Sequence, residues 1–309
     1  MVFKQLVTGV MLGLAMMPAQ AALNVFACEP EWADLTRILV PDAEIRTATT
    51  AWQDPHYIEA RPSLIAAMGR ADIAVCTGAS LESGWLPALI SRASNRGVQP
   101  GKPGLFFAAE QVELHQPHDH VDRSMGDVHP EGDPHIHLDP DRLPDIVEAL
   151  ADRLTELAPD RENAIRLRQR QWHVGWKLNT ARWREAATSL EGMPIVVQHS
   201  TFGYLLRWLG VEAAIDLEPK PGLPPSAAHL GKVLSDPALD EVKVVLIASY
   251  QNDRPAQWLS EKAGLPVEVL PGTVTEEPKT NSLAELISHI IERLQQYNDK
   301  AAPESADHG

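Results

Sequence analysis

Imidazole side chains are the most chemically suggestive groups of this 309-residue chain, and half of its 12 histidines fall between His115 and His137. Three rings stand out by their context: His56 and His135 each end an Asp-Pro-His triplet, and His199 ends an apolar run. Several imidazoles around one ion favour zinc, whereas calcium and magnesium prefer oxygen ligands. A single histidine is more often a surface or capping residue, so a metal site requires that the fold bring these three together.

Short apolar runs alternate with helical patterns along the chain, which predicts parallel sheets with crossover helices. In the first half, we expect strands at 24–28, 44–48, 73–76 and 104–108, and helices at 30–40, 61–70, 85–94 and 141–157. In the second half, we expect strands at 194–198, 213–217, 242–248 and 267–270, and helices at 203–209, 227–235, 255–263 and 281–297. The predicted fold class is α/β, with two Rossmann-like lobes that each contain a mostly parallel sheet.

One long helix is expected to join the lobes, because residues 160–190 contain no proline and a single glycine. Its apolar side chains recur at helical spacing and indicate a packing stripe; they are Ile165, Trp172, Trp176 and Trp183. The predicted boundaries are a signal peptide at 1–21, an N-terminal lobe at 22–158 with a polar loop at 113–133, a bridging helix at 159–191, a C-terminal lobe at 192–300 and a tail at 301–309. A rigid helical bridge predicts only a small movement between the lobes.

Ligands of open α/β sheets collect at the carboxyl ends of the strands. His56 follows the second predicted strand, His199 ends the first strand of the second half, and His135 opens the segment after the polar loop. We therefore expect the three rings to converge in the cleft between the lobes.

The charge balance and the first residues restrict the class of protein. A formal net charge of −15 disfavours nucleic-acid binding, which depends on Lys and Arg. Residues 1–21 have the features of a cleaved secretory signal: Lys4, an apolar stretch at 6–17 and the sequence Ala-Gln-Ala at 19–21. That stretch is too short to span a bilayer, although an uncleaved anchor is the alternative. The expected location is the periplasm, if the source is a Gram-negative bacterium.

The two cysteines, Cys28 and Cys76, each end a predicted strand. In a sheet of order 2-1-3-4 these two strands are neighbours, about 4.8 Å apart, which is within reach of disulfide geometry. An oxidising compartment would allow the bond. The alternative is a pair of small buried side chains that never meet, and the sequence leaves both interpretations open.

Four groups of residues occur in order along the chain: Asp54-Pro55-His56 with Arg61-Pro62-Ser63, Thr77-Gly78-Ala79-Ser80-Leu81-Glu82, Asp133-Pro134-His135 with Leu138-Asp139-Pro140, and Gln198-His199-Ser200-Thr201-Phe202-Gly203-Tyr204. Behind a signal peptide, this set resembles the solute-binding proteins of bacterial zinc and manganese ABC importers, the cluster A-I family. The resemblance covers nearly all of the chain after residue 21 and implies two α/β lobes bridged by a long helix. It also implies that His56, His135 and His199 are metal ligands.

The fourth ligand is where this sequence departs from the family, which usually supplies a carboxylate just before the last helix. Counting back from that helix gives Glu277, our preferred residue, whereas matching the helix start gives Asn281, and Glu276 is a third alternative. A water could also fill the position. Glu218 lies near the carboxylate of manganese-binding relatives, and its use would favour manganese. His137 stands where the family usually has an aromatic residue, so it is not assigned as a ligand.

The polar loop resembles the loop rich in His and acidic residues of zinc-specific members. Its imidazoles could hold a second zinc weakly or pass ions to the deeper site, and the alternative is a solvated loop without such a role. The residues concerned are His115, His118, His120 and His129.

The predicted function is that of a periplasmic high-affinity zinc-binding protein, not an enzyme, which captures Zn²⁺ and delivers it to an ABC permease in the inner membrane. We expect a monomer, with a periplasmic metallochaperone as a further partner. Because neutral imidazole binds metal, acidification below a pKa near 6.5 should release the ion. The alternatives are a manganese-binding protein of the same family, a secreted zinc hydrolase and an adhesin or storage protein.

Overall fold

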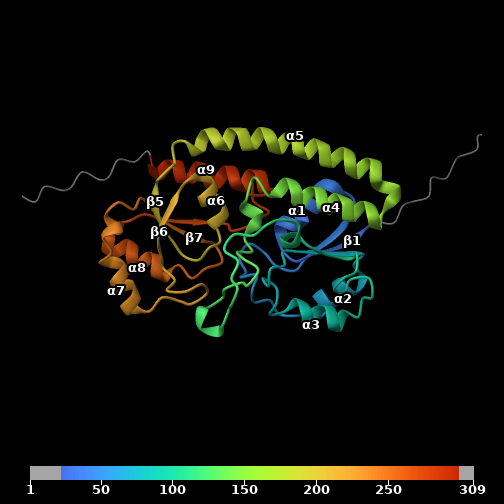
Figure 1. Cartoon of the computed structure of the whole chain (residues 1–309), viewed down its shortest axis with the longest axis horizontal. Helices are drawn as coiled ribbons and strands as arrows, with labels where there is room; N and C mark the ends of the chain where they lie inside the picture. Colours follow the sequence, from blue (N-terminus) through green and yellow to red (C-terminus); the bar gives the residue numbers. More distant parts are fainter. Residues whose placement is uncertain (1–21, 299–309) are drawn as a thin grey trace, which may run out of the picture.

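The computed structural model describes residues 22–298, so the predicted signal peptide at 1–21 and the predicted tail at 301–309 lie outside the described residues. The described chain forms two α/β lobes, and one long helix, α5 (Glu162–Ala187), runs along both of them (Figure 1). The predicted fold class is confirmed. Within residues 22–298, no helix combines the length and the apolar character that crossing a membrane requires.

The N-terminal sheet has four parallel strands in the order β2-β1-β3-β4. Its strands are β1 (Asn24–Ala27), β2 (Glu44–Thr47), β3 (Ile73–Cys76) and β4 (Leu105–Phe107). The helices of this lobe are α1 (Pro30–Leu39), α2 (Pro62–Arg70), α3 (Leu86–Ala93) and α4 (Leu143–Leu157). Helices cover both faces of the sheet, which explains why β3 is apolar at every position and wholly buried.

The C-terminal sheet repeats this arrangement, with the order β6-β5-β7-β8 and parallel pairing throughout. Its strands are β5 (Pro194–Val197), β6 (Glu212–Asp216), β7 (Val245–Ala248) and β8 (Val267–Leu270). Its helices are α6 (Gly203–Leu209), α7 (Ala227–Leu234), α8 (Arg254–Ala263) and α9 (Leu283–Asn298). All the predicted strands and helices are present, with ends that differ by a few residues.

The helix α5 is shorter than the predicted span of 160–190. Residues Pro159–Arg161 form a separate 3₁₀ turn before it. After Ala187 the chain tightens, because the N–H groups of Ser189 and Leu190 bond to carbonyls three residues back. The predicted packing stripe is confirmed: Trp176 and Trp183 are buried, and their indole N–H groups donate to Pro140 O and Ser288 Oγ, at 2.8 and 2.9 Å.

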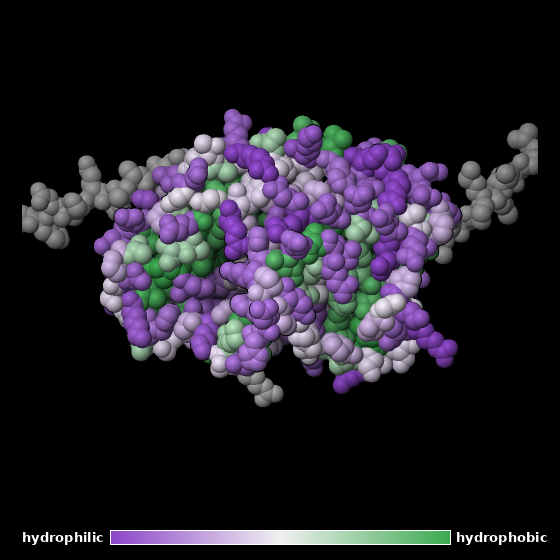
Figure 2. Space-filling view, viewed as in Figure 1, coloured by the Kyte–Doolittle hydropathy of each residue, from purple (hydrophilic) through white to green (hydrophobic). Residues whose placement is uncertain are grey.

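A single hydrophobic core lies beneath α5 and runs through both lobes. It includes side chains of α1 and α4 from the first lobe and of α6 and α9 from the second. Each lobe has in addition an outer core of its own, against α2 and α3 in one and α7 and α8 in the other. The face of the molecule shown in Figure 2 is largely hydrophilic, with hydrophobic patches over each lobe.

Polar contacts also tie the lobes together. Ser249 Oγ donates to Ala51 O at 2.8 Å, the N–H of Leu283 donates to Asp34 Oδ2 at 3.1 Å, and the Thr273 hydroxyl donates to the Glu31 carboxylate. Burial raises the pKa of Asp34 to about 6. These contacts and the shared core hold the two sheets in one relative position.

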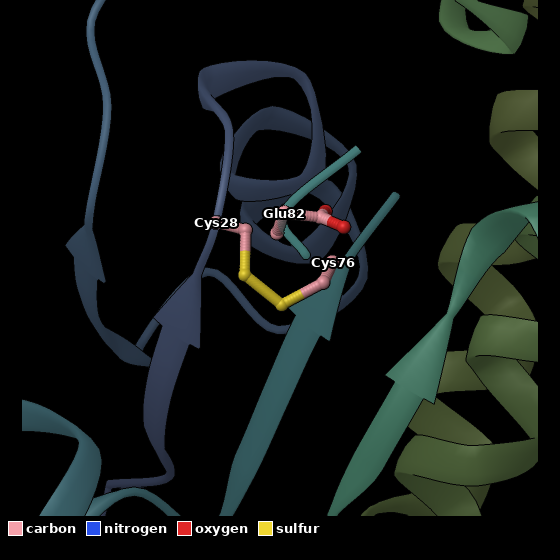
Figure 3. Close-up of side chains that lie close together, drawn as sticks. All are labelled: Cys28, Cys76 and Glu82. Atoms are coloured by element: carbon pink, nitrogen blue, oxygen red, sulfur yellow. A yellow bond between two sulfur atoms is a disulfide. The ribbon is translucent and has the colours of Figure 1, made fainter. Parts of the chain in front are cut away.

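Cys28 and Cys76 are joined by a disulfide, with their Cα atoms 4.8 Å apart (Figure 3). Cys28 follows β1 and Cys76 ends β3, so the bond cross-links adjacent strands just where their carboxyl ends reach the cleft side. Both side chains are fully buried. Of the two interpretations left open by the sequence, the disulfide is the correct one.

The disulfide closes a loop with a sequence separation of 48 residues, so its removal should destabilise the fold. We expect the Cys28→Ala/Cys76→Ala double variant to lose about 2–4 kcal/mol of unfolding free energy, because the denatured chain regains loop entropy. Differential scanning calorimetry of metal-free protein should show a transition lower by several degrees. The expectation would be contradicted if the double variant unfolded at the same temperature as the parent protein and if reductant also left the transition of the parent protein unchanged.

Candidate metal centre

The two Asp-Pro-His triplets adopt the same local structure. In each, one aspartate oxygen accepts a hydrogen bond from the histidine N–H at 3.0 Å and also contacts the imidazole Nδ1. The Nδ1 distances are 2.7 Å for Asp54 and His56 and 2.6 Å for Asp133 and His135. An aspartate that bonds the backbone two residues later forms an Asx turn, so the sequence itself fixes each ring beside its own carboxylate.

His199 is oriented by a different route. It follows β5 with a left-handed backbone (φ 68°), which is uncommon outside glycine and is supported by a hydrogen bond from its N–H to Asp216 Oδ1. Its Nδ1 lies 3.0 Å from Glu218 Oε2. Each of the three histidines therefore has a carboxylate at Nδ1, which leaves Nε2 as the nitrogen available for a metal ion.

The structure brings the three histidines together between the lobes. Their ring centroids are 5.2 Å apart for His135 and His199, 5.8 Å for His56 and His199, and 6.4 Å for His56 and His135. Imidazoles on one tetrahedral zinc ion have centroids about 5 Å apart, given Zn–N bonds near 2 Å. Small side-chain rotations would bring all three rings to that separation.

The three histidines reach the cleft by different routes. His56 and His199 follow strands β2 and β5, whereas His135 lies after the polar loop, as the sequence indicates. It precedes the short 3₁₀ helix Ile136–Leu138 and is reached through the polar loop that follows β4. Its place in the cleft depends on the loop and on the Asx turn with Asp133.

A fourth imidazole joins the cluster. His129, from the polar loop, has its Nε2 atom 3.2 Å from His56 Nε2, and the two ring centroids are 5.3 Å apart. Two nitrogens bound to the same tetrahedral zinc ion would be about 3.3 Å apart. The sequence grouped His129 with the weaker loop site, and nothing in its local pattern distinguished it from its neighbours.

The interior of the cluster keeps two nitrogens without a protein partner. His135 Nε2 and His199 Nε2 are buried, and neither has a hydrogen bond within the described part of the chain. Leaving a buried polar atom unpaired costs free energy, so these two atoms require a partner, and a metal ion fits where several imidazoles meet. Both atoms belong to the two rings whose centroids lie closest together.

Burial lowers the pKa of His135 to about 4, against the opposing effect of Asp133. Burial and the neighbouring His56 likewise lower the pKa of His129 to about 4. Burial alone would also lower the pKa of His199, but the hydrogen bond and the charge of Glu218 raise it above its ordinary value. At neutral pH, His135 and His129 are therefore uncharged, the form that binds metal.

A hollow of about 210 Å³ opens beside His56 and His199. Three acidic side chains line it, namely Asp54, Asp127 and Glu218. Carboxylates at the mouth of a site raise the local concentration of cations. This hollow gives the cluster an approach from solvent with the charge that a metal ion requires.

The predicted fourth ligand, Glu277, lies elsewhere. Its side chain is exposed and lines a separate hollow with Glu268 and Arg293. The alternatives Glu276 and Asn281 are also exposed. The assignment of Glu277 as a ligand stays a prediction that no contact of the described residues supports.

Two further residues have protein partners of their own. Glu218 Oε2 contacts His199 Nδ1 and also accepts a hydrogen bond from Gly222 N at 2.7 Å, so it orients the ring. His137 is buried, with Nε2 2.7 Å from Gly272 O and Nδ1 3.4 Å from Glu31 Oε1. Both nitrogens of His137 thus face protein groups.

The other loop histidines do not gather around one point. The ring of His115 packs against the Tyr204 ring at a centroid distance of 4.6 Å, and burial together with Arg142 lowers its pKa. His118 and His120 are exposed. A second, weaker zinc site on this loop stays a prediction.

A different group of ligand-type side chains lies on the first lobe: Cys28, Cys76 and Glu82 (Figure 3). The bonded cysteines offer no thiolate. Glu82 accepts hydrogen bonds from the N–H groups of Thr77 and Gly78, at 2.6 and 3.0 Å, and burial raises its pKa to about 7. This group stabilises the turn after β3.

Two parallel-sheet lobes bridged by one helix, with polar side chains meeting between them, define the class of helix-bridged solute-binding proteins. Residues 25–297 match the model of one family, ZnuA, described as the zinc-uptake complex component A, periplasmic. The chain belongs to this family.

Among curated relatives, the zinc-binding lipoprotein AdcA of Streptococcus pneumoniae is 23% identical over 292 residues, which cover 92% of this chain and 58% of AdcA. The high-affinity zinc uptake system protein ZnuA of Bacillus subtilis is 25% identical over 221 residues, which cover 70% of this chain and 67% of the Bacillus protein. The chain therefore spans little more than half the length of the streptococcal relative.

Solved structures agree on the fold. A crystal structure of ZnuA superposes with a TM-score of 0.76 at 18% identity, covering 90% of this chain and all of its own. The periplasmic zinc-binding protein TroA of Treponema pallidum gives a TM-score of 0.74, also at 18% identity, covering 91% of this chain and all of its own. At these identities the likeness establishes the fold alone.

The lowered pKa of His135 can be measured in metal-free protein. The folded ring titrates at about 4 and the unfolded ring near 6.5. Between these values the unfolded chain binds more protons, so this ring makes stability fall as the pH drops from about 6.5 to 4. NMR titration of the imidazole C–H signals, assigned with His135→Gln, should show a midpoint near pH 4. A midpoint near 6.5 for that ring would contradict the burial argument.

Proposed function

We propose that this protein captures Zn²⁺ through His56, His135 and His199 and delivers it to an ABC permease. The observation that carries the proposal is the pair of buried Nε2 atoms without a protein partner, on rings whose Nδ1 atoms face carboxylates. The carboxylate fixes the ring orientation and makes Nε2 the better ligand. Membership of the zinc-uptake family supports the same cargo.

We further propose His129 as the fourth ligand in place of Glu277. Its Nε2 atom already lies at the distance from His56 Nε2 that two ligands of one zinc ion require. Its low pKa keeps it neutral at physiological pH. Glu277, in contrast, is exposed and lines another hollow.

Four imidazoles favour zinc over manganese, since manganese is better suited by carboxylate and water ligands. The carboxylates nearest the rings are Asp54, Asp133 and Glu218, and each already contacts an imidazole Nδ1. The manganese alternative would need Glu218 to leave both His199 and Gly222. The geometry therefore favours the zinc-type function.

The same contacts disfavour the hydrolase alternative. Attack by a zinc-bound water needs a free general base beside the metal. Asp54, Asp133 and Glu218 orient imidazoles, and Glu277 lies in a separate hollow. We propose a binding protein without catalytic activity.

Reversible transport also fits the placement of the site. The core beneath α5 is formed by hydrophobic side chains of both lobes, whose packing does not require a metal ion. We therefore expect the metal-free protein to stay folded, which a carrier needs and a structural zinc site usually does not allow. We propose a monomer in the periplasm, with an inner-membrane permease and a metallochaperone as partners.

Zinc titration of single variants tests the ligand set. We expect His56→Ala, His135→Ala and His199→Ala each to weaken zinc binding by at least about 100-fold, more than the loss of an orienting group would. His129→Ala should weaken it less, because three protein ligands and a water form a stable zinc site. Competition with a chromophoric chelator gives the dissociation constants.

Glu277→Ala is the matched control and should bind zinc like the parent protein. His173→Ala, on α5 and bonded through Nδ1 to Gln169 O, is the control for loss of an imidazole outside the cluster. Equal weakening by Glu277→Ala and His135→Ala would return Glu277 to the ligand set. Tight zinc binding that survives all three cleft variants would exclude the proposed site.

A further inference from the structure

We infer that Asp127 is a positioning residue that fastens the polar loop across the cleft and thereby sets the rate at which the metal enters and leaves. The inference rests on the proposed zinc-binding function and adds a gate to the same site. Asp127 lies two residues before His129, the loop histidine that contacts His56.

The loop is attached to the N-terminal lobe by side-chain hydroxyls. Tyr57 OH donates to Asp127 Oδ2 at 2.9 Å, and Ser80 Oγ lies 3.0 Å from both carboxylate oxygens of Glu131. Tyr57 follows His56 directly, so the bond to Asp127 holds the loop beside the first Asp-Pro-His turn. Tyr57 is 70% exposed, which leaves this contact at the surface, where it can open.

The same stretch of loop is attached to the C-terminal lobe through the turn at residues 218–222. The N–H of Asp127 donates to Pro221 O at 2.8 Å, and Lys220 Nζ donates to Ser124 O at 2.5 Å. Asp127 therefore forms a hydrogen bond to the N-terminal lobe through its side chain and to the C-terminal lobe through its backbone. We name residues 124–127 the strap, because they join the two lobes over the hollow beside His56 and His199.

Two glycines make this close contact feasible. Gly126 has φ +86°, and a Cβ added there would lie 2.3 Å from Pro221 O. Gly222 has φ +72°, and a Cβ added there would lie 2.1 Å from Asp127 Oδ2. Both positions combine a left-handed backbone with an approach that only glycine permits.

The strap acts on the metal-binding rings from two sides. On the loop side it sets the position of His129 against His56. On the lobe side, Glu218 Oε2 contacts both Gly222 N and His199 Nδ1, so the turn that seats the strap also orients a predicted ligand. Asp127 itself lines the hollow by which an ion would approach.

A gate in the loop is needed because the lobes share one core. Opening the cleft by a hinge would separate side chains of α1, α4, α6 and α9 that pack together beneath α5. Releasing the strap breaks only a few exposed hydrogen bonds, each of which contributes little net free energy. The strap is therefore the lower-cost route for the ion.

Rapid mixing of zinc-loaded protein with excess chelator measures the rate. We expect Asp127→Leu and Gly222→Ala to release zinc roughly tenfold faster, as the loss of one or two such contacts would allow. Gly222→Ala keeps the Asp127 carboxylate at the mouth of the hollow, so zinc association should also become faster in this variant, and its dissociation constant should change less than its release rate. Asp127→Asn keeps an acceptor for Tyr57 OH and should restore most of the parent rate.

Gly264→Ala is the matched control for backbone strain. Gly264 also has φ +72° and lies in the C-terminal lobe, but a Cβ there meets nothing within 4 Å. It should leave both rates unchanged, although the strain of its left-handed backbone also lowers the unfolding temperature. Hydrogen exchange of the Asp127 amide should accelerate in Gly222→Ala alone.

Failure of the strap and failure of the proposed function give different results. If the parent protein binds no zinc tightly, the proposed function is wrong. If it does, and Asp127→Leu and Gly222→Ala release zinc at the parent rate, the strap does not control the site. Faster release from Gly222→Ala with unchanged association would also overturn the gate, because loss of a ligand alone produces that result.

Discussion

The hydrophobic core beneath α5 is the constraint on which the rest of the structure depends. It is continuous through both lobes, and it is reinforced by polar contacts such as those of Asp34 with Leu283 and Ser249 with Ala51. The carboxyl ends of the two sheets are therefore held facing each other at a fixed separation. A fixed separation makes the cleft a preformed site, in which side chains need only rotate to meet an ion.

Holding several imidazoles together in the cleft before a metal ion binds is electrostatically unfavourable, and the carboxylates at their Nδ1 atoms reduce this cost. Imidazoles buried beside one another resist protonation, as the low pKa values of His135 and His129 indicate. A carboxylate at Nδ1 holds each cleft ring in the tautomer that directs the Nε2 lone pair inward. The opposite shift at His199, where Glu218 outweighs burial, shows that the balance is set separately at each ring.

Much of this arrangement could be predicted from the sequence, because it is encoded locally. Alternating apolar runs predicted each strand. The Asp-Pro-His triplets marked His56 and His135 as candidates, but their Asx turns, which orient the rings, were found only in the structure. The neighbouring positions of β1 and β3 predicted the disulfide as one of two outcomes. The place of His129 could not be predicted, since it depends on a loop whose path is set by contacts between Gly126 and Pro221, far apart in sequence.

A rigid site must still release its cargo, and the four proposed ligands differ in how readily they can move. His56 and His199 follow strands, and His135 is fixed by its turn and by the buried 3₁₀ helix after it, so moving any of them disturbs a lobe. His129 alone belongs to a segment whose attachments are hydrogen bonds near the surface. Zinc with three protein ligands and an open fourth position remains bound but exchanges more readily. With His129 as the proposed fourth ligand, tight binding and release would depend on different parts of the chain, and release would need no change in the core.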